Sequence, residues 1–129
     1  MPVAASLHVL VVDDQMSIRS LVRSGLSQLG VQHITEASDG GEALKSLALN
    51  PAHLVISDYN MPNMNGLDLL KAIRANPPTA KTAFIMLTGR ADRDLVQKAV
   101  QFGVNNYLVK PFNVQVLKGK IEQVFGALT

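Results

Sequence analysis

The sequence predicts an α/β fold: a five-stranded parallel β-sheet with helices on both faces. Five short apolar segments recur along the 129 residues, and amphipathic segments separate them at the spacing that parallel β–α–β crossovers need. Most of the apolar segments are continuous runs of Val, Ile and Leu, which is typical of strands buried on both faces. We therefore expect a single domain that covers residues 1–129.

Each expected strand is a run of apolar and often β-branched residues. The strands are Leu7 to Val12, Val31 to Ala37, His53 to Ser57, Ala83 to Leu87 and Tyr107 to Val109. Apolar and polar residues alternate in the second of these, which predicts a strand nearer the edge of the sheet.

Apolar residues at helical spacing define the expected helices. The helices contain Ile18 to Leu29, Ala43 to Ala48, Leu67 to Ile73, Leu95 to Val100 and Val114 to Val124. Gly30 closes the first helix, Pro51 stops the second, and Pro77 follows the third. A loop rich in Asn, Pro and Gly, residues 60–66, leads into the third helix.

Composition and charge exclude several classes of protein. With 47% hydrophobic and 17% charged residues, the chain is typical of a globular protein. The net charge of +2 is too small to indicate a nucleic-acid partner, and the absence of Cys excludes disulfides and thiolate metal sites. The longest near-continuous apolar stretch, Val9 to Val12, is far shorter than the ~20 residues that span a bilayer. We expect a cytoplasmic protein with no signal peptide and no membrane insertion.

Three histidines, His8, His33 and His53, lie within or beside expected strands. Their spacing does not match that of metal ligands, and we interpret them as partly buried structural residues. The Lys and Arg residues are spread along the chain and are typical of solvated helix faces.

Polar residues stand where the expected strands end. Asp13 and Asp14 follow the first strand, Asp58 the third, Thr88 the fourth and Lys110 the last. In an open α/β sheet, ligands bind outside the carboxyl ends of the strands, so we expect these five side chains to converge on one cleft.

The convergence of three carboxylates, a hydroxyl and an ammonium indicates phosphoryl chemistry. Carboxylates packed together repel one another, and a hard divalent cation such as Mg²⁺ relieves that repulsion. A Lys and a Thr hydroxyl suit the oxygens of a transferred phosphoryl group, and a carboxylate can accept that group as an aspartyl-phosphate. Taken singly, each residue has a plainer interpretation: the acid pair as a helix N-cap, Thr88 as a strand-end hydroxyl and Lys110 as a surface lysine.

Four separated motifs in this sequence resemble those of response-regulator receiver domains. They are Asp13–Asp14, Ser57–Gly66, Leu87–Gly89 and Tyr107–Phe112. The resemblance extends over essentially the whole chain, and the Asn-Met-Pro loop and the Val-Lys-Pro-Phe segment resemble the chemotaxis regulators of the CheY type. It implies a flavodoxin-like (CheY-like) fold with strand order 2-1-3-4-5. A transcription factor would need a second, basic DNA-binding domain, and we expect no such effector domain because no residues remain for one after the last expected helix.

The resemblance also implies a role for each site residue. Asp58 would accept the phosphoryl group from a phosphohistidine on a sensor histidine kinase. Asp14, Asp58 and the backbone carbonyl of Asn60 would ligate Mg²⁺, with Asp13 acting mainly through water. Lys110 would pair with a phosphoryl oxygen.

By the same resemblance, the peptide bond between Lys110 and Pro111 would be cis. Thr88 would be drawn toward the phosphoryl group, and Tyr107 would then swing from an exposed to a buried position. The surface that changes would extend from about residue 92 to residue 125.

Two positions depart from the most familiar receiver pattern. Gly89 stands where Ala is common, which would loosen its loop, and Arg90 stands where an acid is common. Loss of the phosphoryl group needs an in-line water at the mouth of the cleft. Asn60 could gate that water by orienting it, and Arg90 by covering the phosphoryl oxygens. The alternative is that Arg90 simply points to solvent.

The expected function is a phosphorylation-activated switch in a two-component system, which catalyses only its own phosphorylation and dephosphorylation. The expected partners are a CheA-like histidine kinase, an output protein such as a flagellar motor switch component, and a phosphatase, and we expect a monomer. A phosphate sink and a phosphorelay intermediate are alternatives.

Other classes of protein fit the sequence less well. A phosphohydrolase of the haloacid dehalogenase type would need Asp-x-Asp after the first strand, where this chain has Asp13-Asp14-Gln15. A nucleotide-binding protein would need a Gly-rich phosphate loop at the same place, and the sequence has none.

Overall fold

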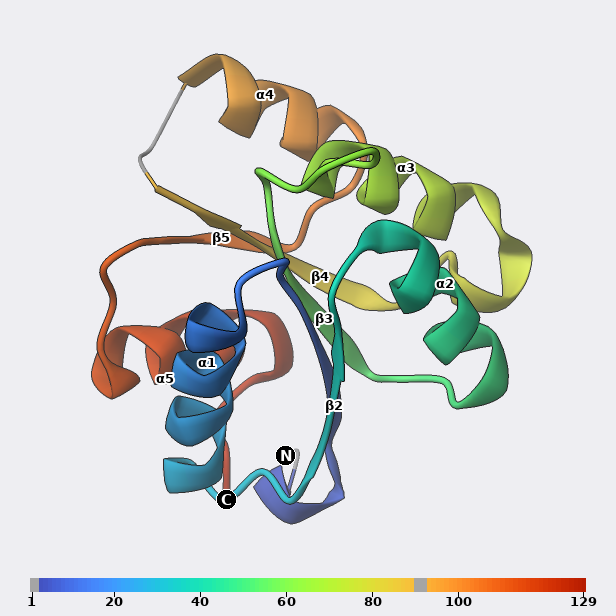
Figure 1. The fold of residues 1–129 in the computed structure, drawn as a ribbon. Helices are drawn as coiled ribbons and strands as arrows, with labels where there is room; N and C mark the ends of the chain where they lie inside the picture. The colour runs from blue at the N-terminus through green and yellow to red at the C-terminus, as the bar shows by residue number, and fades with distance from the viewer. Residues whose placement is uncertain (1–2, 90–92) are drawn as a thin grey trace.

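A parallel sheet of five strands forms the centre of the computed structural model, which describes residues 3–89 and 93–129 (Figure 1). The strands are β1 (His8–Val12), β2 (His33–Ala37), β3 (Leu54–Asp58), β4 (Ala83–Thr88) and β5 (Asn106–Val109). Their order across the sheet is β2-β1-β3-β4-β5, and every neighbouring pair is parallel. The predicted α/β class, the parallel sheet and the strand order are confirmed.

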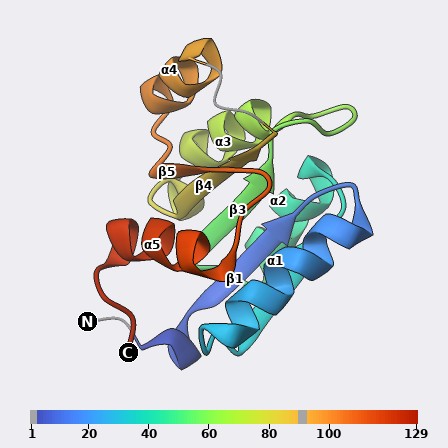
Figure 2. The same cartoon turned by 90° about the vertical axis from the view of Figure 1, so that its left-hand side faces the viewer.

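Helices cover both faces of the sheet. They are α1 (Met16–Gln28), α2 (Gly40–Leu49), α3 (Gly66–Ala75), α4 (Arg93–Gln101) and α5 (Val114–Phe125), with the short 3₁₀ helices η1 (Ala4–Ser6) and η2 (Pro77–Thr79). Helices α1 and α5 lie on one face, and α2, α3 and α4 lie on the other (Figures 1 and 2). No helix within the described residues is long and apolar enough to cross a bilayer.

The continuous apolar runs of the sequence are explained by these two layers of helices. In β1, Val9 and Val11 point into the core shared with α1 and α5, whereas Leu10 and Val12 point into the core shared with α2 and α3. All four side chains are at most 1% exposed. Each such side chain contributes about 1.5–3 kcal/mol by leaving water, so a polar residue on either face of β1 would be costly.

Polar side chains set the starts of three helices. Asp39 accepts a hydrogen bond from the backbone N–H of Glu42 at the start of α2 (2.7 Å). Asn65 caps α3 and Asn113 caps α5 in the same way, at 2.8 and 2.9 Å. Each cap satisfies a backbone N–H that has no partner within its own helix, which is worth about 1 kcal/mol.

Some element boundaries differ from the sequence expectations. Asp58 and Thr88 were expected just after their strands, but they are the last residues of β3 and β4, because their backbones still pair with Leu87 and Val109. Helices also begin earlier than their apolar residues suggest, as Met16 in α1 illustrates, since a polar or exposed first turn carries no periodic signal.

The expectation of three partly buried histidines is wrong. His8 is 4% exposed, whereas His33 and His53 are exposed. The reason is position: His33 opens the edge strand β2, and His53 precedes β3 at the amino end of the sheet.

Arg74, near the end of α3, ties that helix to the loop after α4. Its guanidinium donates to the carbonyl oxygens of Thr82 (2.6 Å) and Gly103 (2.9 Å) and to the side chain of Asn105 (3.0 Å). On the preceding turn, Lys71 Nζ lies 4.5 Å from the ring centroid of Phe102. The carboxyl-terminal end of α4 is therefore fastened to α3.

The two ends of the described chain lie side by side at the amino end of the sheet, opposite the loops that follow β1 and β3 (Figure 1). The backbone N–H of Ala4 donates to the carbonyl oxygen of Thr129 (3.2 Å).

Candidate functional site

Three carboxylates meet at the carboxyl ends of β1 and β3. Asp13, Asp14 and Asp58 each offer an oxygen, and these oxygens all lie within 4.8 Å of one another. The strands are direct neighbours in the sheet, so the residues that end them or follow them must lie close together. The expected convergence of the acids is confirmed.

Asp13 is completely buried, and its two carboxylate oxygens differ. Oδ1 accepts from the backbone N–H of Gln15 (2.8 Å), whereas Oδ2 has no hydrogen-bond partner among the described residues. Burial raises the pKa of Asp13 to about 6, and the nearby carboxylates of Asp58 and Asp14 add to this increase, while the Gln15 N–H and Lys110 oppose it.

The buried, unpartnered oxygen is the observation that tests whether a metal fits. A buried carboxylate oxygen with no partner is costly, and a set of three carboxylates is the donor chemistry of a hard divalent cation. The residues present therefore fit Mg²⁺. The interpretation of the acid pair as a helix N-cap is wrong, because Gln15 occupies the N-cap of α1 and makes no side-chain capping bond.

Lys110 extends to the same place from the end of β5. Its Nζ lies 3.0 Å from Asp58 Oδ1, and the Asp58 side chain is 7% exposed. The backbone N–H of Lys110 donates to the carbonyl oxygen of Thr88 (2.7 Å), which joins the ends of β5 and β4. The peptide bond between Lys110 and Pro111 is cis. Lys110 is therefore no ordinary surface lysine but the cationic partner of one particular carboxylate in the cluster.

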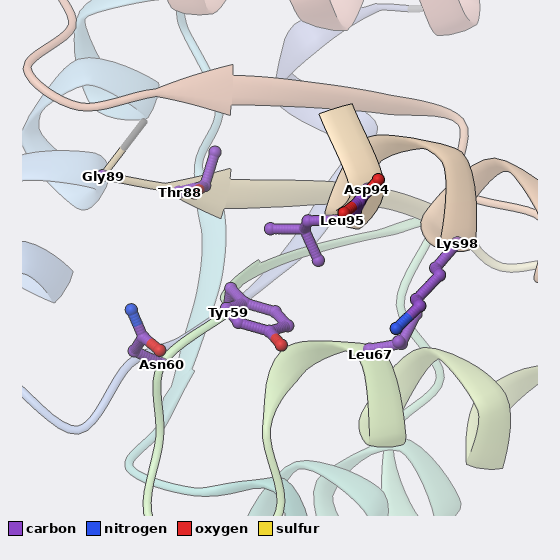
Figure 3. A pocket seen from close by; sticks show the side chains of 8 residues that line it. All are labelled: Tyr59, Asn60, Leu67, Thr88, Gly89, Asp94, Leu95 and Lys98. Carbon is purple, nitrogen blue, oxygen red and sulfur yellow. The ribbon is translucent and has the colours of Figure 1, made fainter. Parts of the chain in front are cut away.

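Thr88 is buried and borders a pocket of about 550 Å³ on the α4 side of the cluster (Figure 3). The pocket is lined by Tyr59, Asn60, Leu67, Thr88, Gly89, Asp94, Leu95 and Lys98. Figure 3 shows Lys98 extending from α4 toward Leu67 and the ring of Tyr59. A second hollow of about 410 Å³, which includes Asp14 and Asn60 in its lining, opens on the other side of Asn60.

The loop after Asp58 is shaped by a glycine that the sequence analysis did not single out. A Cβ on Gly66 would lie 2.5 Å from the carbonyl oxygen of Asp58 and 2.6 Å from Met86 Sδ. The Gly66 N–H also donates to the carbonyl oxygen of Tyr59 (2.8 Å). Gly66 therefore lets the start of α3 lie against the backbone of Asp58, a close approach that no local sequence pattern indicates.

A second unpredicted contribution comes from α1. Arg19 donates through Nη1 to the carbonyl oxygen of Asp13 (2.6 Å) and through Nε to Glu36 on β2 (3.0 Å). The backbone N–H of Asp13 in turn donates to the carbonyl oxygen of Ala37 (3.1 Å). These bonds fix the backbone that presents Asp13 and Asp14.

Tyr107 lies on β5 and is neither fully buried nor exposed. Lys120 Nζ lies 4.8 Å from its ring centroid, a cation–π contact between β5 and α5. The expected gating residue Arg90 lies outside the described residues, as does residue 92, at which the expected switch surface begins. Asn60 is exposed at the rim of both hollows.

Comparison with known proteins agrees with this site. Residues 9–122 match the family profile of the response regulator receiver domain. The chain belongs to this family, whose members are phosphorylation-activated switches of two-component systems and signalling proteins rather than conventional enzymes. The phosphohydrolase and nucleotide-binding alternatives are thereby set aside.

Within the family, the chain is a receiver of the CheY chemotaxis type. It is 52% identical to the probable chemotaxis protein CheY of Rhizobium etli, over 99% of both chains. It is 42% identical to the chemotaxis protein CheY of Pseudomonas aeruginosa, which covers 92% of this chain and 96% of that one. The solved structure of CheY4 of Vibrio cholerae has a TM-score of 0.84 at 35% identity and covers 92% of this chain and 98% of that one.

Proposed function

We propose that Asp58 is the phosphoacceptor of this receiver. The observation that carries the proposal is the 3.0 Å pairing of Asp58 Oδ1 with Lys110 Nζ inside a cluster of three carboxylates. One carboxylate oxygen of Asp58 forms a bond to phosphorus, and the bond from phosphorus to the donor's histidine nitrogen breaks, with its electron pair remaining on the imidazole. Only Asp58 combines a place in the cluster with an ammonium partner among the described residues.

Mg²⁺ would be held by Asp14, Asp58 and the backbone carbonyl of Asn60, with Asp13 acting mainly through water. When bound, the ion would neutralise the carboxylates and the oxygens of the incoming phosphoryl group. The proposal is supported by the unpartnered Oδ2 of Asp13 and by the raised pKa of that residue.

Lys110 and Thr88 would bind the oxygens of the phosphoryl group once Asp58 is phosphorylated. The Lys110 ammonium exchanges its contact with Asp58 for one with a phosphoryl oxygen, which keeps the new charge paired. Thr88 donates its hydroxyl to a second phosphoryl oxygen, and Tyr107, on the neighbouring strand β5, responds by moving inward. Asn60 orients the water that later removes the group. The companion role expected for Arg90 lies outside the described residues.

The partners follow from the family. As a receiver, the protein works with a histidine kinase and an output protein. We propose a CheA-like kinase and a flagellar motor switch component, because the relatives are named as chemotaxis proteins. We further propose that residues 1–129 act as a single monomeric receiver domain in the cytoplasm and catalyse only their own phosphorylation and dephosphorylation.

The test is phosphorylation by phosphoramidate or acetyl phosphate, with and without Mg²⁺, measured as the mass gain of one phosphoryl group. We expect incorporation only with Mg²⁺ and none in Asp58→Asn, since the amide is a poor nucleophile. Asp68→Asn, at an exposed acid on α3, is the matched control and should label fully. Full labelling of Asp58→Asn would refute the assignment of Asp58.

A pull-down that compares phosphorylated and unphosphorylated protein would then test the output. Phosphorylation-dependent capture of a motor switch component supports the proposal. Rapid transfer of the phosphoryl group to a histidine phosphotransfer protein would instead indicate a relay, and rapid loss without any captured partner would indicate a phosphate sink.

A further inference from the structure

All three histidines of the chain gather at the amino end of the sheet, opposite the carboxylate cluster. His8 opens β1 and His33 opens β2, and the strand register places them directly opposite each other. His53 precedes the first residue of β3, the strand on the other side of β1. The cluster therefore spans three adjacent strands and has no part in the phosphorylation site.

The hydrogen bonds of His8 suit a neutral ring. Its Nδ1 lies 2.9 Å from the carbonyl oxygen of Pro51, which can only accept, so Nδ1 carries a proton. Its Nε2 lies 2.9 Å from the hydroxyl of Thr35, which can donate to the lone pair of the neutral ring. Both ring nitrogens of His8 are thus engaged, which also leaves neither free for a metal ion.

The His8 ring stacks on the ring of His33, with centroids 3.8 Å apart and an angle of 8° between the planes. Parallel rings at this distance pack well when both are uncharged. A proton on either ring puts a positive charge against its neighbour, and two protons put like charges face to face.

His53 adds a bond that a proton would break. The backbone N–H of His8 donates to His53 Nδ1 (2.9 Å), so this nitrogen needs its lone pair and the neutral ring must carry its proton on Nε2. A second proton would occupy Nδ1 and point at the N–H that it now accepts. The backbone of His53 also donates to the carbonyl oxygen of His8 (2.9 Å), so the two residues are joined twice.

No Asp or Glu in the described part of the chain offsets a positive charge here, and the hollow that His53 lines is also lined by a cation, Lys81. In the described part of the chain, none of the three histidines forms an ion pair with an acid. On β2, the carboxylate of Glu36 is engaged with Arg19 and Arg23 of α1. On α2, which packs on β1 and β2, the charged residues are Glu42, whose carboxylate accepts from Ser38, and the exposed Lys45.

We propose that His8, His33 and His53 form a proton-sensitive latch that holds the amino ends of β1, β2 and β3 together when all three rings are neutral and loosens when the cluster takes up a proton. Burial, and the neighbouring His33 and His53, lower the pKa of His8, while the Pro51 carbonyl acts in the opposite direction. The unfolded chain therefore binds protons more readily than the folded one, and the stabilisation is lost as the pH falls below about 6.5, the ordinary value for histidine.

Hydrogen exchange of the whole protein at pH 7.5 and pH 5.5, expressed as protection factors to correct for the intrinsic rate, tests the latch. We expect protection of β1 and β2 amides to fall at the lower pH, by up to about tenfold because pH 5.5 lies about one unit below the ordinary histidine pKa of about 6.5, while β4 and β5 change less.

The variant His33→Phe with His53→Asn keeps a stacked ring and an acceptor at the Nδ1 position but cannot titrate at either residue. It should fold at pH 7.5 and show a weaker pH dependence of β1 and β2 than the wild type, because the contributions of His33 and His53 are gone while the buried His8 keeps its own. Asp13 titrates in the same range, so the quantity to compare is the difference between wild type and variant, in which Asp13 cancels.

Equal pH dependence in the two proteins would overturn the proposal, as would an acid-induced loss of protection that begins in β4 and β5. If the double variant does not fold, His33→Phe alone provides the same comparison. It replaces the imidazole that stacks on His8 with an uncharged ring and leaves the hydrogen bond from His8 to His53 in place.

Discussion

Removing the charge of Asp13 should stabilise the metal-free protein. The pKa of Asp13 lies at about 6, against 3.8 without the surroundings of the fold, a difference of about two pKa units. At about 1.4 kcal/mol per unit, ionising this carboxylate costs the folded state about 3 kcal/mol at neutral pH. Asp13→Asn removes that cost but keeps a similar shape, so the free energy of unfolding should rise by up to about 3 kcal/mol.

The added stability of Asp13→Asn should depend on pH, because it comes from the raised pKa of Asp13. A raised carboxyl pKa penalises the folded state only where the group is ionised, so the full gain appears above pH 6. It shrinks as the pH falls and vanishes below about pH 4, where Asp13 is protonated in both states. Urea denaturation in the presence of a chelator, from pH 4 to pH 8, measures this curve for the wild type and the variant.

Addition of Mg²⁺ should reverse the order of the two proteins at neutral pH. The ion binds the folded wild type and stabilises it, whereas Asp13→Asn has one carboxylate fewer to offer. Asp68→Asn is the control, because its carboxylate is exposed and lies outside the cluster. A chelated Asp13→Asn protein that is no more stable than the wild type at pH 7.5 would show that electrostatic repulsion in the cluster has been overestimated.

Three further substitutions test the fold and the switch. Gly66→Ala should lower the free energy of unfolding by about 1–3 kcal/mol and impair phosphorylation. Gly119→Ala, in α5 with open space around it, should favour the helix and change the free energy of unfolding by no more than about 1 kcal/mol. Similar urea midpoints for the two variants would be inconsistent with the close approach at Gly66. Arg74→Ala should lower the free energy of unfolding by about 2–3 kcal/mol, because it leaves the carbonyl groups of Thr82, before β4, and Gly103, after α4, without this donor. An unchanged urea midpoint would contradict this. Thr88→Ala should still accept a phosphoryl group, but fluorotyrosine NMR should show no phosphorylation-dependent shift of Tyr107; a shift equal to that of the wild type would disprove the coupling.

Much of the fold could be predicted because a parallel sheet covered on both faces leaves a strong pattern. The runs of β1, β3 and β4 are apolar at every position except near their ends, and β2 alternates because it forms an edge. The same regularity located the site, since Asp13, Asp58 and Lys110 all stand at carboxyl ends of strands that a parallel sheet must bring together.

The unpredicted features depend on contacts between distant parts of the chain. The stacking of His8 on His33 requires the register of β1 against β2, which neither segment specifies alone. Gly66 is needed because the backbone of Asp58 passes close to the start of α3, and Arg74 on α3 binds the loop that follows α4. Contacts between distant segments leave no periodic pattern in the sequence. The sequence therefore does not indicate which residues lie next to these side chains in the fold.

The adjacency of Ala4 and Thr129 gives the receiver a one-sided architecture. Both ends of the described chain lie at the amino end of the sheet, opposite the carboxyl ends of β1 and β3 where the carboxylates meet (Figure 2). A linker, tag or tether at either end would therefore leave the entrance of the cleft and the exposed side of α4 unobstructed. Fusion of another protein at either end should therefore leave the carboxylate cluster and α4 accessible to a partner.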